Sequence, residues 1–586
     1  MNVAAGTKLL HHFHSLTRSS SQLRRRHLHV RCYCMAASTA SGISLANLLW
    51  NKHRSQAVLA LYHPFVVSLA AGVLDIGSFR NYIAQDAFFL QAFSTAYHLL
   101  RDNVDDDISK LTVNHLLQGV KDELQLHSSY AQAWGVDLSI ASHRNKATVK
   151  YTEFLLATAS GEERKQGGTT ALDRLRLAAF TVGAMTPCMR LYAFLGQEIK
   201  KHLGADCSDS PYHEWIGTYS SKEFESSTLQ IESLLDTLAA HLGEDDTSKL
   251  ENLYSQAFTL ELEFFSGQPN CQCTVLPFIR RQIDGSDASY LLMTDFDLTC
   301  SVTDSCSALA SVSVQAAMKK GQDDRLRPHQ KSAAELRRCW DSLEKSYSEH
   351  YSRITTLPEV EENCARLFNI DGLRSFLERL SDFEMQSNTE VIRQGVFEGL
   401  NLEDVWNAGH DMALQEGCTE FFRQISLKGN VNAHIISVCW SKSFVKGALS
   451  KEGLEYIEVH SNELMTSASC TSGDIKRMVE TPFNKERVFE ELMHKAGNLS
   501  RSVRSIYIGD SVTDLLCLLQ ADIGIVIGSN STLQRVAKAF GVSMVPLYKG
   551  VLGMVKLGIP QGGTISGVLY VVTDWHEIRA FLTAGS

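Results

Sequence analysis

The first 74 residues of this sequence contain no acidic side chain, because Asp75 is the first one. The first 35 residues are also basic and rich in serine and histidine, which is typical of an organelle transit peptide. A disordered basic tail would have the same composition and stays as the alternative. No long apolar stretch follows, which argues against a secretion signal. The basic residues of this segment are Lys8, Arg18, Arg24, Arg25, Arg26 and Arg31.

We therefore expect residues 1–35 to direct the protein to an organelle, with the mitochondrion as the prediction and the plastid as the alternative. Met35 begins the stretch MAASTASG. Translation from Met35 would produce a cytosolic form that lacks the basic segment.

The sequence also lacks an unbroken apolar run that could span a membrane. The longest apolar region, residues 58–74, is interrupted by His63 and Pro64, so a buried helix is expected there. The formal net charge of −10 gives no reason to expect nucleic acid or an anionic membrane as a partner.

Cysteine is present but follows no binding pattern. The fourteen cysteines are scattered along a large chain, which favours a reducing compartment over disulfides. Cys271 and Cys273 form a C-x-C pair, but no C-x-x-C pair accompanies it, so no zinc site is expected from the cysteines.

Two compositional regimes divide the chain, whose 586 residues are too many for one ordinary domain. Residues 44–268 repeat apolar side chains at three- and four-residue spacing, as in SSTLQIESLLDTLAAHL, and predict an all-α bundle. Residues 269–288 contain proline, glycine and polar residues and are interpreted as a linker.

Residues 289–586 alternate short β-branched runs with helical stretches, which predicts a parallel α/β sheet. The predicted strands are SYLLMT, NAHIISV, RSIYIG and IGIVIG. A charged and mostly helical insertion follows the first strand, and we expect it, at about residues 305–415, to form a cap over the sheet.

Polar residues follow several of these strands, and the carboxyl ends of parallel strands meet at one edge of a sheet. PFNKERVFEEL predicts a helix that begins near Pro482 and holds Lys485 in its first turn. Clustered carboxylates attract a divalent cation, and hard oxygen ligands select Mg²⁺. The expected ligands are Asp295, Asp297, Asp510 and Asp514, with Thr299, Ser437 and Lys485 beside them.

The order D-x-D-x-T, serine, lysine and G-D-x-x-x-D resembles the haloacid dehalogenase (HAD) phosphatase superfamily over about residues 289–575. The resemblance implies that Asp295 attacks phosphorus and carries the phosphoryl group as an aspartyl phosphate. Asp297 would protonate the leaving alcohol and then activate water. Ser437, Lys485 and Thr299 would bind the phosphorylated substrate, and the cap would set substrate choice.

The helical half places polar side chains inside apolar helices. Tyr82, Asp86 and Phe89 share one predicted helix face, and Glu261 lies in the apolar stretch FTLELEFF, where an unpaired carboxylate is costly. The structural alternative is that the cysteine in TPCMRLYAFLG is a small buried apolar residue and that the aromatic residues belong to the hydrophobic core.

The segments YIAQDAFFL, YTEFLLATASG, TPCMRLYAFLG, WIGTYSSKEF and ELEFF resemble the TenA/thiaminase II family, over residues 45–266. The resemblance implies a pocket that binds an aminopyrimidine, with Cys188 as nucleophile and Glu261 as acid and base. It also implies homo-oligomers. Phe89 departs from the tyrosine that is typical of bacterial relatives. The residues implied to bind the substrate are Asp86, Tyr151, Tyr192 and Tyr219.

The combination of the two halves resembles the bifunctional thiamin-salvage enzymes of plants. It predicts a Mg²⁺-dependent phosphatase of thiamin monophosphate joined to a hydrolase that releases ammonia from aminomethyl-pyrimidines. The TenA/thiaminase II family includes enzymes that cleave thiamin and enzymes that deaminate its breakdown products, and we favour salvage. The alternative is a phosphatase of FMN, nucleotides or sugar phosphates, fused to a non-catalytic pyrimidine-binding or oligomerisation module.

Overall fold

The chain divides into two compact units, which are described separately. The first unit takes in the chain up to Ala57, Phe79–Gly196 and Thr218–Gly267, and the second takes in Val58–Ser78, Gln197–Gly217 and Gln268–Ser586. The boundaries predicted from composition, 44–268 and 289–586, stay predictions.

The computed structural model describes residues 44–133, 143–161, 170–269, 275–280, 288–320, 331–356, 367–467, 470–499, 502–558 and 567–583. The predicted transit segment, the pair Cys271 and Cys273, and most of the predicted linker lie outside these residues.

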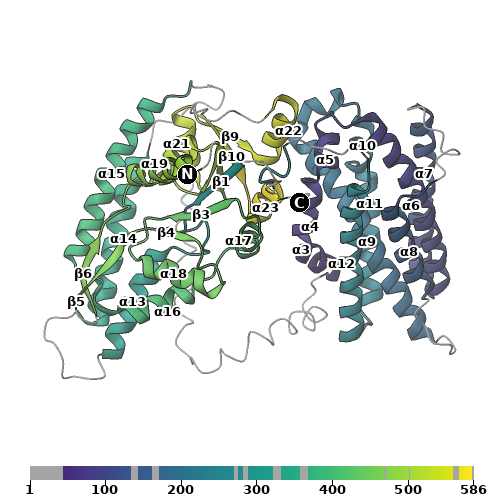
Figure 1. Cartoon of the computed structure of the whole chain (residues 1–586). Helices are drawn as coiled ribbons and strands as arrows, with labels where there is room; N and C mark the ends of the chain where they lie inside the picture. Colours follow the sequence, from purple (N-terminus) through teal and green to yellow (C-terminus); the bar gives the residue numbers. More distant parts are fainter. Residues whose placement is uncertain are drawn as a thin grey trace. The chain divides into compact units, whose positions relative to one another are not determined.

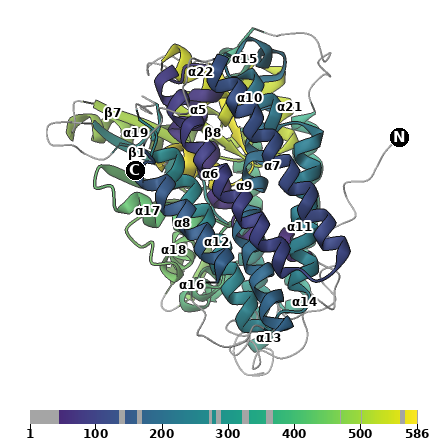
Figure 2. The ribbon, with the colours of Figure 1, turned by 90° about the vertical axis from the view of Figure 1, so that its right-hand side faces the viewer.

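The first unit is helical, and its described residues contain no strand, as the apolar spacing predicts. Its long helices lie side by side (Figures 1 and 2). The helix α8 shows how local sequence sets the ends: the Asn145 side chain accepts from the Thr148 N–H at 2.7 Å, and Gly161 ends the helix in the left-handed conformation. The helices that lie wholly or mainly in this unit are α3 (Leu45–Lys52), α6 (Ile76–Asn103), α7 (Asp107–Ala133), α8 (Lys146–Ser160), α9 (Ala171–Leu203), α11 (Lys222–Ala239) and α12 (Glu244–Ser266). The helices α4 (Arg54–Leu61) and α10 (His213–Tyr219) are divided between the two units.

Among the described residues, α9 has the length and hydropathy of a membrane-crossing helix, but 78% of its apolar window is buried in the structure. The region predicted as one buried helix, residues 58–74, instead contains the end of α4 and the separate helix α5 (Pro64–Ala70). Pro64 lacks an N–H and starts a new helix, and the His63 side chain caps that helix by accepting from Phe65 N–H. A short 3₁₀ helix, η2, covers Gly204–Asp209.

The second unit contains a seven-stranded parallel sheet with the order β4-β3-β1-β7-β8-β10-β9. The strand β1 lies between β3 and β7, so the carboxyl ends of these three strands are adjacent. The sequence predicted β1, β3, β7 and β8 but not β4, β9 or β10. The strands are β1 (Ala288–Thr294), β3 (Val431–Ile436), β4 (Glu458–His460), β7 (Ser502–Gly509), β8 (Ile523–Ile527), β9 (Ser543–Pro546) and β10 (Val568–Val572).

Helices follow the strands of this sheet, as in an α/β fold (Figure 1). Val488, Phe489 and Leu492 of α19 share a buried apolar core with Leu291 and Met293 of β1. This packing holds the first turn of α19 near the end of β1. The helices are α17 (Cys418–Ser426), α18 (Lys442–Lys451), α19 (Pro482–Leu499), η3 (Val512–Asp514), α20 (Leu515–Gln520), α21 (Ser531–Ala539), α22 (Leu547–Leu557) and α23 (Trp575–Thr583).

The insertion after β1 is mainly helical, with α13 (Ser305–Lys320), α14 (Ala333–Thr355), α15 (Ile370–Arg393) and α16 (Leu402–His410). It also holds a strand that the sequence did not predict, β2 (Glu398–Asn401). This strand joins the hairpin β5 (Glu463–Ser467) and β6 (Cys470–Lys476) in a three-stranded antiparallel sheet, β2-β6-β5. The insertion is therefore completed by a segment from much later in the chain.

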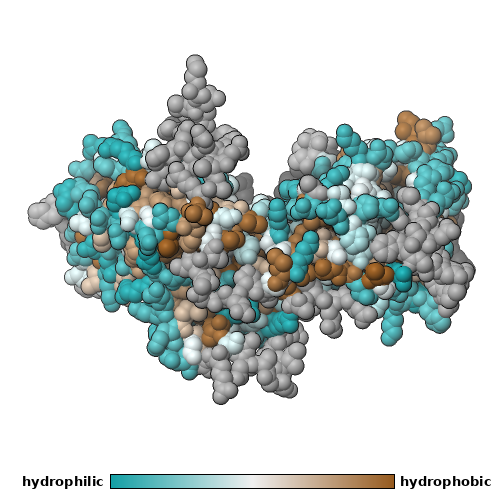
Figure 3. Space-filling model, turned by 90° about the horizontal axis from the view of Figure 1, so that it is seen from above, coloured by the Kyte–Doolittle hydropathy of each residue, from teal (hydrophilic) through white to brown (hydrophobic). Residues whose placement is uncertain are grey.

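Large apolar side chains are buried in each unit, such as Phe258 and Phe264 in the first and Tyr507 and Trp575 in the second. On the face seen in Figure 3, hydrophilic residues cover much of the coloured surface of each unit. This distribution is what the hydrophobic effect dictates for surfaces that face water.

Candidate active sites

The loop after β1 presents Asp295 at the carboxyl end of the central strand. The Asp295 N–H donates to Ile508 O at 2.9 Å, which extends the pairing of β1 with β7. The backbone then turns sharply, with Cys300 N–H donating to Phe296 O at 2.9 Å and Leu298 in the left-handed region at φ 58°. The turn leaves the Asp295 side chain buried, with 3% of its surface exposed.

Lys485 is a fully buried cation between two of the predicted site carboxylates. Its Nζ lies 2.9 Å from Asp295 Oδ1 and 2.8 Å from Asp514 Oδ1. Burial would lower the pKa of Lys485, but the two carboxylates outweigh that effect and raise it, so the lysine stays charged. The prediction that α19 begins at Pro482 and carries Lys485 in its first turn is confirmed.

The loop after β7 brings in the remaining carboxylates. Asp514 accepts from Tyr507 OH at 2.9 Å and from Ser511 Oγ at 2.7 Å. A Cβ on Gly509 would lie 2.6 Å from Asp514 Cγ, so only glycine allows this close approach. Thr299 Oγ1 donates to Asp510 Oδ1 at 2.8 Å, which ties this loop to the one after β1.

Asp295, Asp510 and Asp514 converge with ligand atoms that all lie within 4.8 Å of one another. Burial raises the pKa of Asp295 well above its ordinary range, and the neighbouring Asp514 raises it further. Burial and Asp514 likewise raise the pKa of Asp510 to about 7. A divalent cation would relieve this repulsion, and three carboxylates are the hard oxygen donors that Mg²⁺ prefers. The residues present therefore fit a magnesium site.

Asp297 does not belong to this three-carboxylate cluster. Ser305 holds both of its oxygens, with the backbone N–H at 2.7 Å from Oδ1 and the hydroxyl at 2.9 Å from Oδ2. Burial and the nearby Asp304 together raise the pKa of Asp297 to about 7, against the opposing effect of the bonds from Ser305. A carboxyl group with this pKa can both donate and accept a proton near neutral pH.

Ser437, predicted to bind phosphate, is buried at the end of β3. Its Oγ accepts from Cys439 N–H at 3.0 Å, and its own N–H donates to His460 O at 2.9 Å. The structure thus places Ser437 just after the end of β3, the strand that pairs with β1.

A cavity of about 660 Å³ opens on Asp295, Asp297 and Asp510. Its described lining residues include no lysine or arginine. Trp340, Tyr347 and Phe383 come from the insertion helices, and the rings of Tyr347 and Phe383 lie 5.1 Å apart. Further aromatic and acidic lining residues are Tyr351, Trp440, Asp304, Glu344, Glu384, Glu390 and Glu480.

Glu384 is the carboxylate most closely joined to the aromatic wall. It accepts from Tyr347 OH at 2.8 Å. Burial raises the pKa of Glu384 to about 7. A positively charged group beside Glu384 would favour its ionised form. No motif in the sequence marks the insertion residues Trp340, Tyr347, Phe383 and Glu384, because cap residues have no motif of their own.

The first unit contains a second, smaller pocket of about 80 Å³. Four residues expected to bind or attack the substrate line it together, namely Asp86, Cys188, Tyr192 and Tyr219. The other two adjoin it, because Tyr151 OH donates to Glu261 Oε1 at 2.7 Å and the Cys188 thiol also bonds Glu261. The structure therefore brings all six residues into one neighbourhood.

The carboxyl groups of this pocket are buried, and its described lining residues include no lysine or arginine to balance their charge. Burial raises the pKa of Glu261 to about 7, although its bonds from Tyr151 and Cys188 oppose the rise. Burial also raises the pKa of Asp86 and that of the Cys188 thiol, whose pKa rises further because Glu261 is near. The thiol is thus protonated at neutral pH, with Glu261 placed to accept its proton.

Glu123 is a pocket residue that no motif in the sequence marks as functional. It lines the pocket and accepts from Tyr219 OH at 2.6 Å, and burial raises its pKa. In the sequence it stands in the polar stretch VKDELQLH, which looks like a solvated helix face. Phe89, by contrast, packs against Tyr151 with ring centroids 4.6 Å apart, so the missing hydroxyl leaves an apolar wall.

Comparisons with known proteins find similarity to the helical unit and to most of the whole chain. The TENA/THI-4/PQQC family model matches residues 50–270. The bifunctional TH2 protein, mitochondrial, of Arabidopsis thaliana is 42% identical over 553 residues, which cover 92% of this chain and 89% of that protein. The aminopyrimidine aminohydrolase of Halalkalibacterium halodurans is 27% identical and is matched over 94% of its length by 38% of this chain.

Among solved structures, a phosphoserine phosphatase in a phospho-aspartyl intermediate analogue form aligns with 42% of this chain and 91% of its own, at 14% identity and a TM-score of 0.28. The fold and the comparisons define a protein of two parts, a helical part that matches the TENA/THI-4/PQQC family model and an α/β part built on a seven-stranded parallel sheet. The chain belongs to the family of the bifunctional TH2 protein.

Proposed function

We propose that this protein is a bifunctional thiamin-salvage enzyme. Its second unit would hydrolyse thiamin monophosphate, and its first would release ammonia from aminomethyl-pyrimidine breakdown products of thiamin. The observation that carries the phosphatase assignment is the aromatic and acidic cavity over the three-aspartate cluster.

The cavity is matched to a substrate that is anionic at one end and cationic and aromatic at the other. Lys485 and the cation site would receive the phosphoryl group, whereas the outer cavity offers rings and carboxylates. Thiamin monophosphate has a positively charged thiazolium ring, which aromatic faces and a carboxylate stabilise. A nucleotide or a sugar phosphate has no cation to place there, so these alternatives fit the cavity less well.

In the phosphatase reaction, Asp295 attacks phosphorus while the bond to the substrate oxygen breaks. Asp297 gives its proton to the leaving thiamin alcohol. Asp297 then takes a proton from water, which attacks phosphorus, releases inorganic phosphate and restores Asp295. Lys485 neutralises charge on Asp295 and the phosphoryl oxygens. Mg²⁺ held by Asp295, Asp510 and Asp514 would supply further positive charge for the transferred phosphoryl group.

In the helical pocket, the Cys188 thiol passes its proton to Glu261 and the sulfur adds to the pyrimidine ring. Glu261 then returns a proton to the amino group, which departs from its methylene carbon as ammonia. Water adds to that carbon, Glu261 takes the water proton and passes it to the sulfur, and the carbon–sulfur bond breaks, which restores the Cys188 thiol and releases the hydroxymethyl product. Asp86 would hold the polar edge of the ring, and Tyr151, Tyr192 and Tyr219 would pack around it. This assignment is supported by the bonds from Tyr151 and Cys188 to Glu261.

A substrate comparison tests the phosphatase assignment. We expect the highest kcat/KM with thiamin monophosphate, ahead of FMN, AMP and phosphoserine, in the presence of Mg²⁺. The matched control is the phosphate ester of the thiazole alcohol, which has the same leaving alcohol but no charged ring. Equal kcat/KM for these two substrates would contradict the role of the acidic cavity.

The remaining proposals concern the whole chain. We infer a mitochondrial location from the composition of residues 1–35 and from membership in the family of a mitochondrial protein. Imaging of the chain with and without residues 1–34 tests this. Homo-oligomers are expected by analogy with TenA proteins, and light scattering of the purified protein measures the assembly directly.

A further inference from the structure

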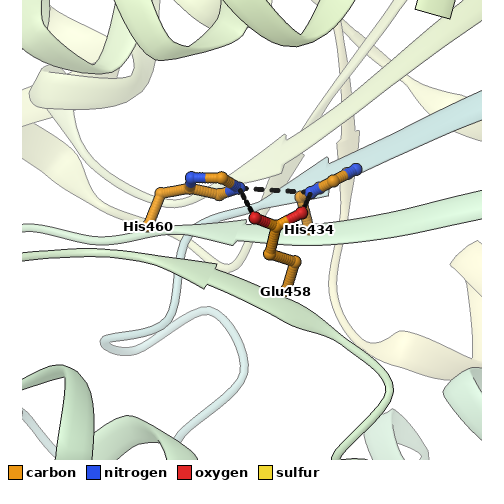
Figure 4. Close-up of side chains that lie close together, drawn as sticks. All are labelled: His434, Glu458 and His460. Carbon is orange, nitrogen blue, oxygen red and sulfur yellow. Dashed lines mark hydrogen bonds and ion pairs between the residues drawn. The ribbon is translucent and has the colours of Figure 1, made fainter.

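A second cluster of metal-binding side chains lies away from the aspartates, at the edge of the parallel sheet. His434 of β3 stands opposite Glu458 of the edge strand β4, and His460 follows two residues after Glu458. Residues two apart in a strand point to the same face, so all three side chains share one face. Figure 4 shows the three side chains turned toward one another.

The three donor atoms are spaced as ligands of one small ion would be. His434 Nδ1 lies 3.2 Å from His460 Nε2 and 3.5 Å from Glu458 Oε2. His460 Nε2 lies 3.9 Å from Glu458 Oε1. Two ligands bound at the usual distances to a tetrahedral zinc ion are about 3.3 Å apart. Small side-chain movements would therefore bring all three donors into tetrahedral geometry.

Both imidazoles are largely buried, with 12% of the His434 side chain and 20% of the His460 side chain exposed. A neutral imidazole binds a metal ion through a ring nitrogen. The Glu458 side chain is 63% exposed, so solvent can reach the site and supply a further ligand.

We propose that His434, Glu458 and His460 form a zinc site with three protein ligands and one water. Two imidazole nitrogens and one carboxylate suit Zn²⁺, whereas the all-carboxylate cluster at Asp295, Asp510 and Asp514 suits Mg²⁺. The two sites would therefore take different ions from the same solution.

The position of the site gives the ion a structural task. The ion would link the edge strand β4, which carries Glu458 and His460, to the neighbouring strand β3, which carries His434. His460 also accepts the Ser437 N–H through its carbonyl at 2.9 Å, so the same strand pair supports the end of β3. Zinc is thus expected to stabilise the second unit rather than to take part in turnover.

The test measures zinc binding by the full-length protein after chelator treatment, with excess Mg²⁺ present to occupy the aspartate cluster. We expect His460→Gln and Glu458→Gln each to lose one zinc equivalent or to weaken it by at least about tenfold. The matched control is His494→Gln, which changes an exposed histidine of α19 and should retain the wild-type stoichiometry. Thermal unfolding should show a zinc-dependent rise in Tm for wild type and control only.

Cobalt supplies a second readout, because Co²⁺ bound by nitrogen ligands in tetrahedral geometry absorbs visible light strongly. Wild type should show this absorption, and His460→Gln should not. Retained phosphatase activity shows that each variant is folded. Zinc binding that is unchanged in His460→Gln and Glu458→Gln would overturn the proposal. So would an absence of binding by wild type, which would leave His434 and His460 as a hydrogen-bonded pair only.

Discussion

The two candidate active sites both bury several carboxyl groups, but they manage the charge differently. In the second unit, Lys485 lies between Asp295 and Asp514, and the residues fit a divalent cation. In the first unit, the described lining of the pocket has no lysine or arginine, and burial raises the pKa of Glu261 to about 7. Under the proposed function, the first arrangement would neutralise an anionic substrate and the second would hold and transfer protons.

The largest expected effect is on the phosphatase side of this comparison. Asp295→Asn removes the proposed nucleophile and a proposed ligand of the cation site, so phosphate release should fall by at least about a thousandfold. Ammonia release from an aminomethyl-pyrimidine should stay unchanged. Phosphate and ammonia assays on the same preparation measure both. Substantial residual phosphatase activity in a folded variant would rule out the aspartyl phosphate.

The corresponding change in the helical pocket is Cys188→Ser. A hydroxyl is a much weaker nucleophile, so ammonia release should fall by at least about a hundredfold while phosphate release continues. Equal ammonia release from wild type and variant would exclude Cys188 as the nucleophile. If neither protein released ammonia, the non-catalytic binding module would be the better description of this unit.

A smaller effect, on KM, is expected at Glu384, which would contact the charged ring of the proposed substrate. Glu384→Gln keeps the shape of the side chain but removes its charge, so KM for thiamin monophosphate should rise about tenfold, or about 1.4 kcal/mol. KM for the phosphate ester of the thiazole alcohol, whose ring is uncharged, should not change. A parallel rise for both substrates would mean that Glu384 shapes the cavity rather than recognises a cation.

The last prediction concerns the free energy of unfolding rather than turnover, and it measures what the buried Glu261 costs the folded state. The folded pKa of Glu261 is about 7, above its ordinary 4.5, so its stabilising contribution is present below 4.5 and is lost as pH rises through 7. Glu261→Gln should therefore be more stable than wild type at pH 8, by up to about 3 kcal/mol. Near pH 4.5 this advantage should vanish. Denaturant unfolding at both pH values measures it, and Glu263→Gln, on a half-exposed neighbour, is the control.

Much of the fold followed from local patterns in the sequence. Three- and four-residue spacing predicted the helical unit, and β-branched runs predicted β1, β3, β7 and β8. The hairpin β5–β6 was missed because β5 is short and because the buried positions of β6 are Thr471, Gly473 and Ile475, so its alternating burial is not matched by an alternation of apolar residues in the sequence. The pairing of β6 with β2 joins residues about seventy positions apart, which no local pattern encodes.

The sites show the same division. The sequence motifs predicted Asp295, Lys485 and Asp514 as site residues because the order of these motifs along the chain is distinctive. Glu123 was missed because a glutamate in a polar stretch looks solvated until a neighbouring helix buries it. His434 and His460 were missed because 25 residues separate them and only the pairing of β3 with β4 brings them together.

The sequence by itself determined which chemical groups this protein has and in what order, since periodicity and motifs are local properties of the chain. Tertiary structure alone decided which groups meet and in which protonation state. A buried lysine between two aspartates, a protonated thiol beside a glutamate, and two imidazoles at 3.2 Å all depend on burial and on contacts between distant segments. Burial is what raises or lowers each pKa, and it exists only in the folded chain.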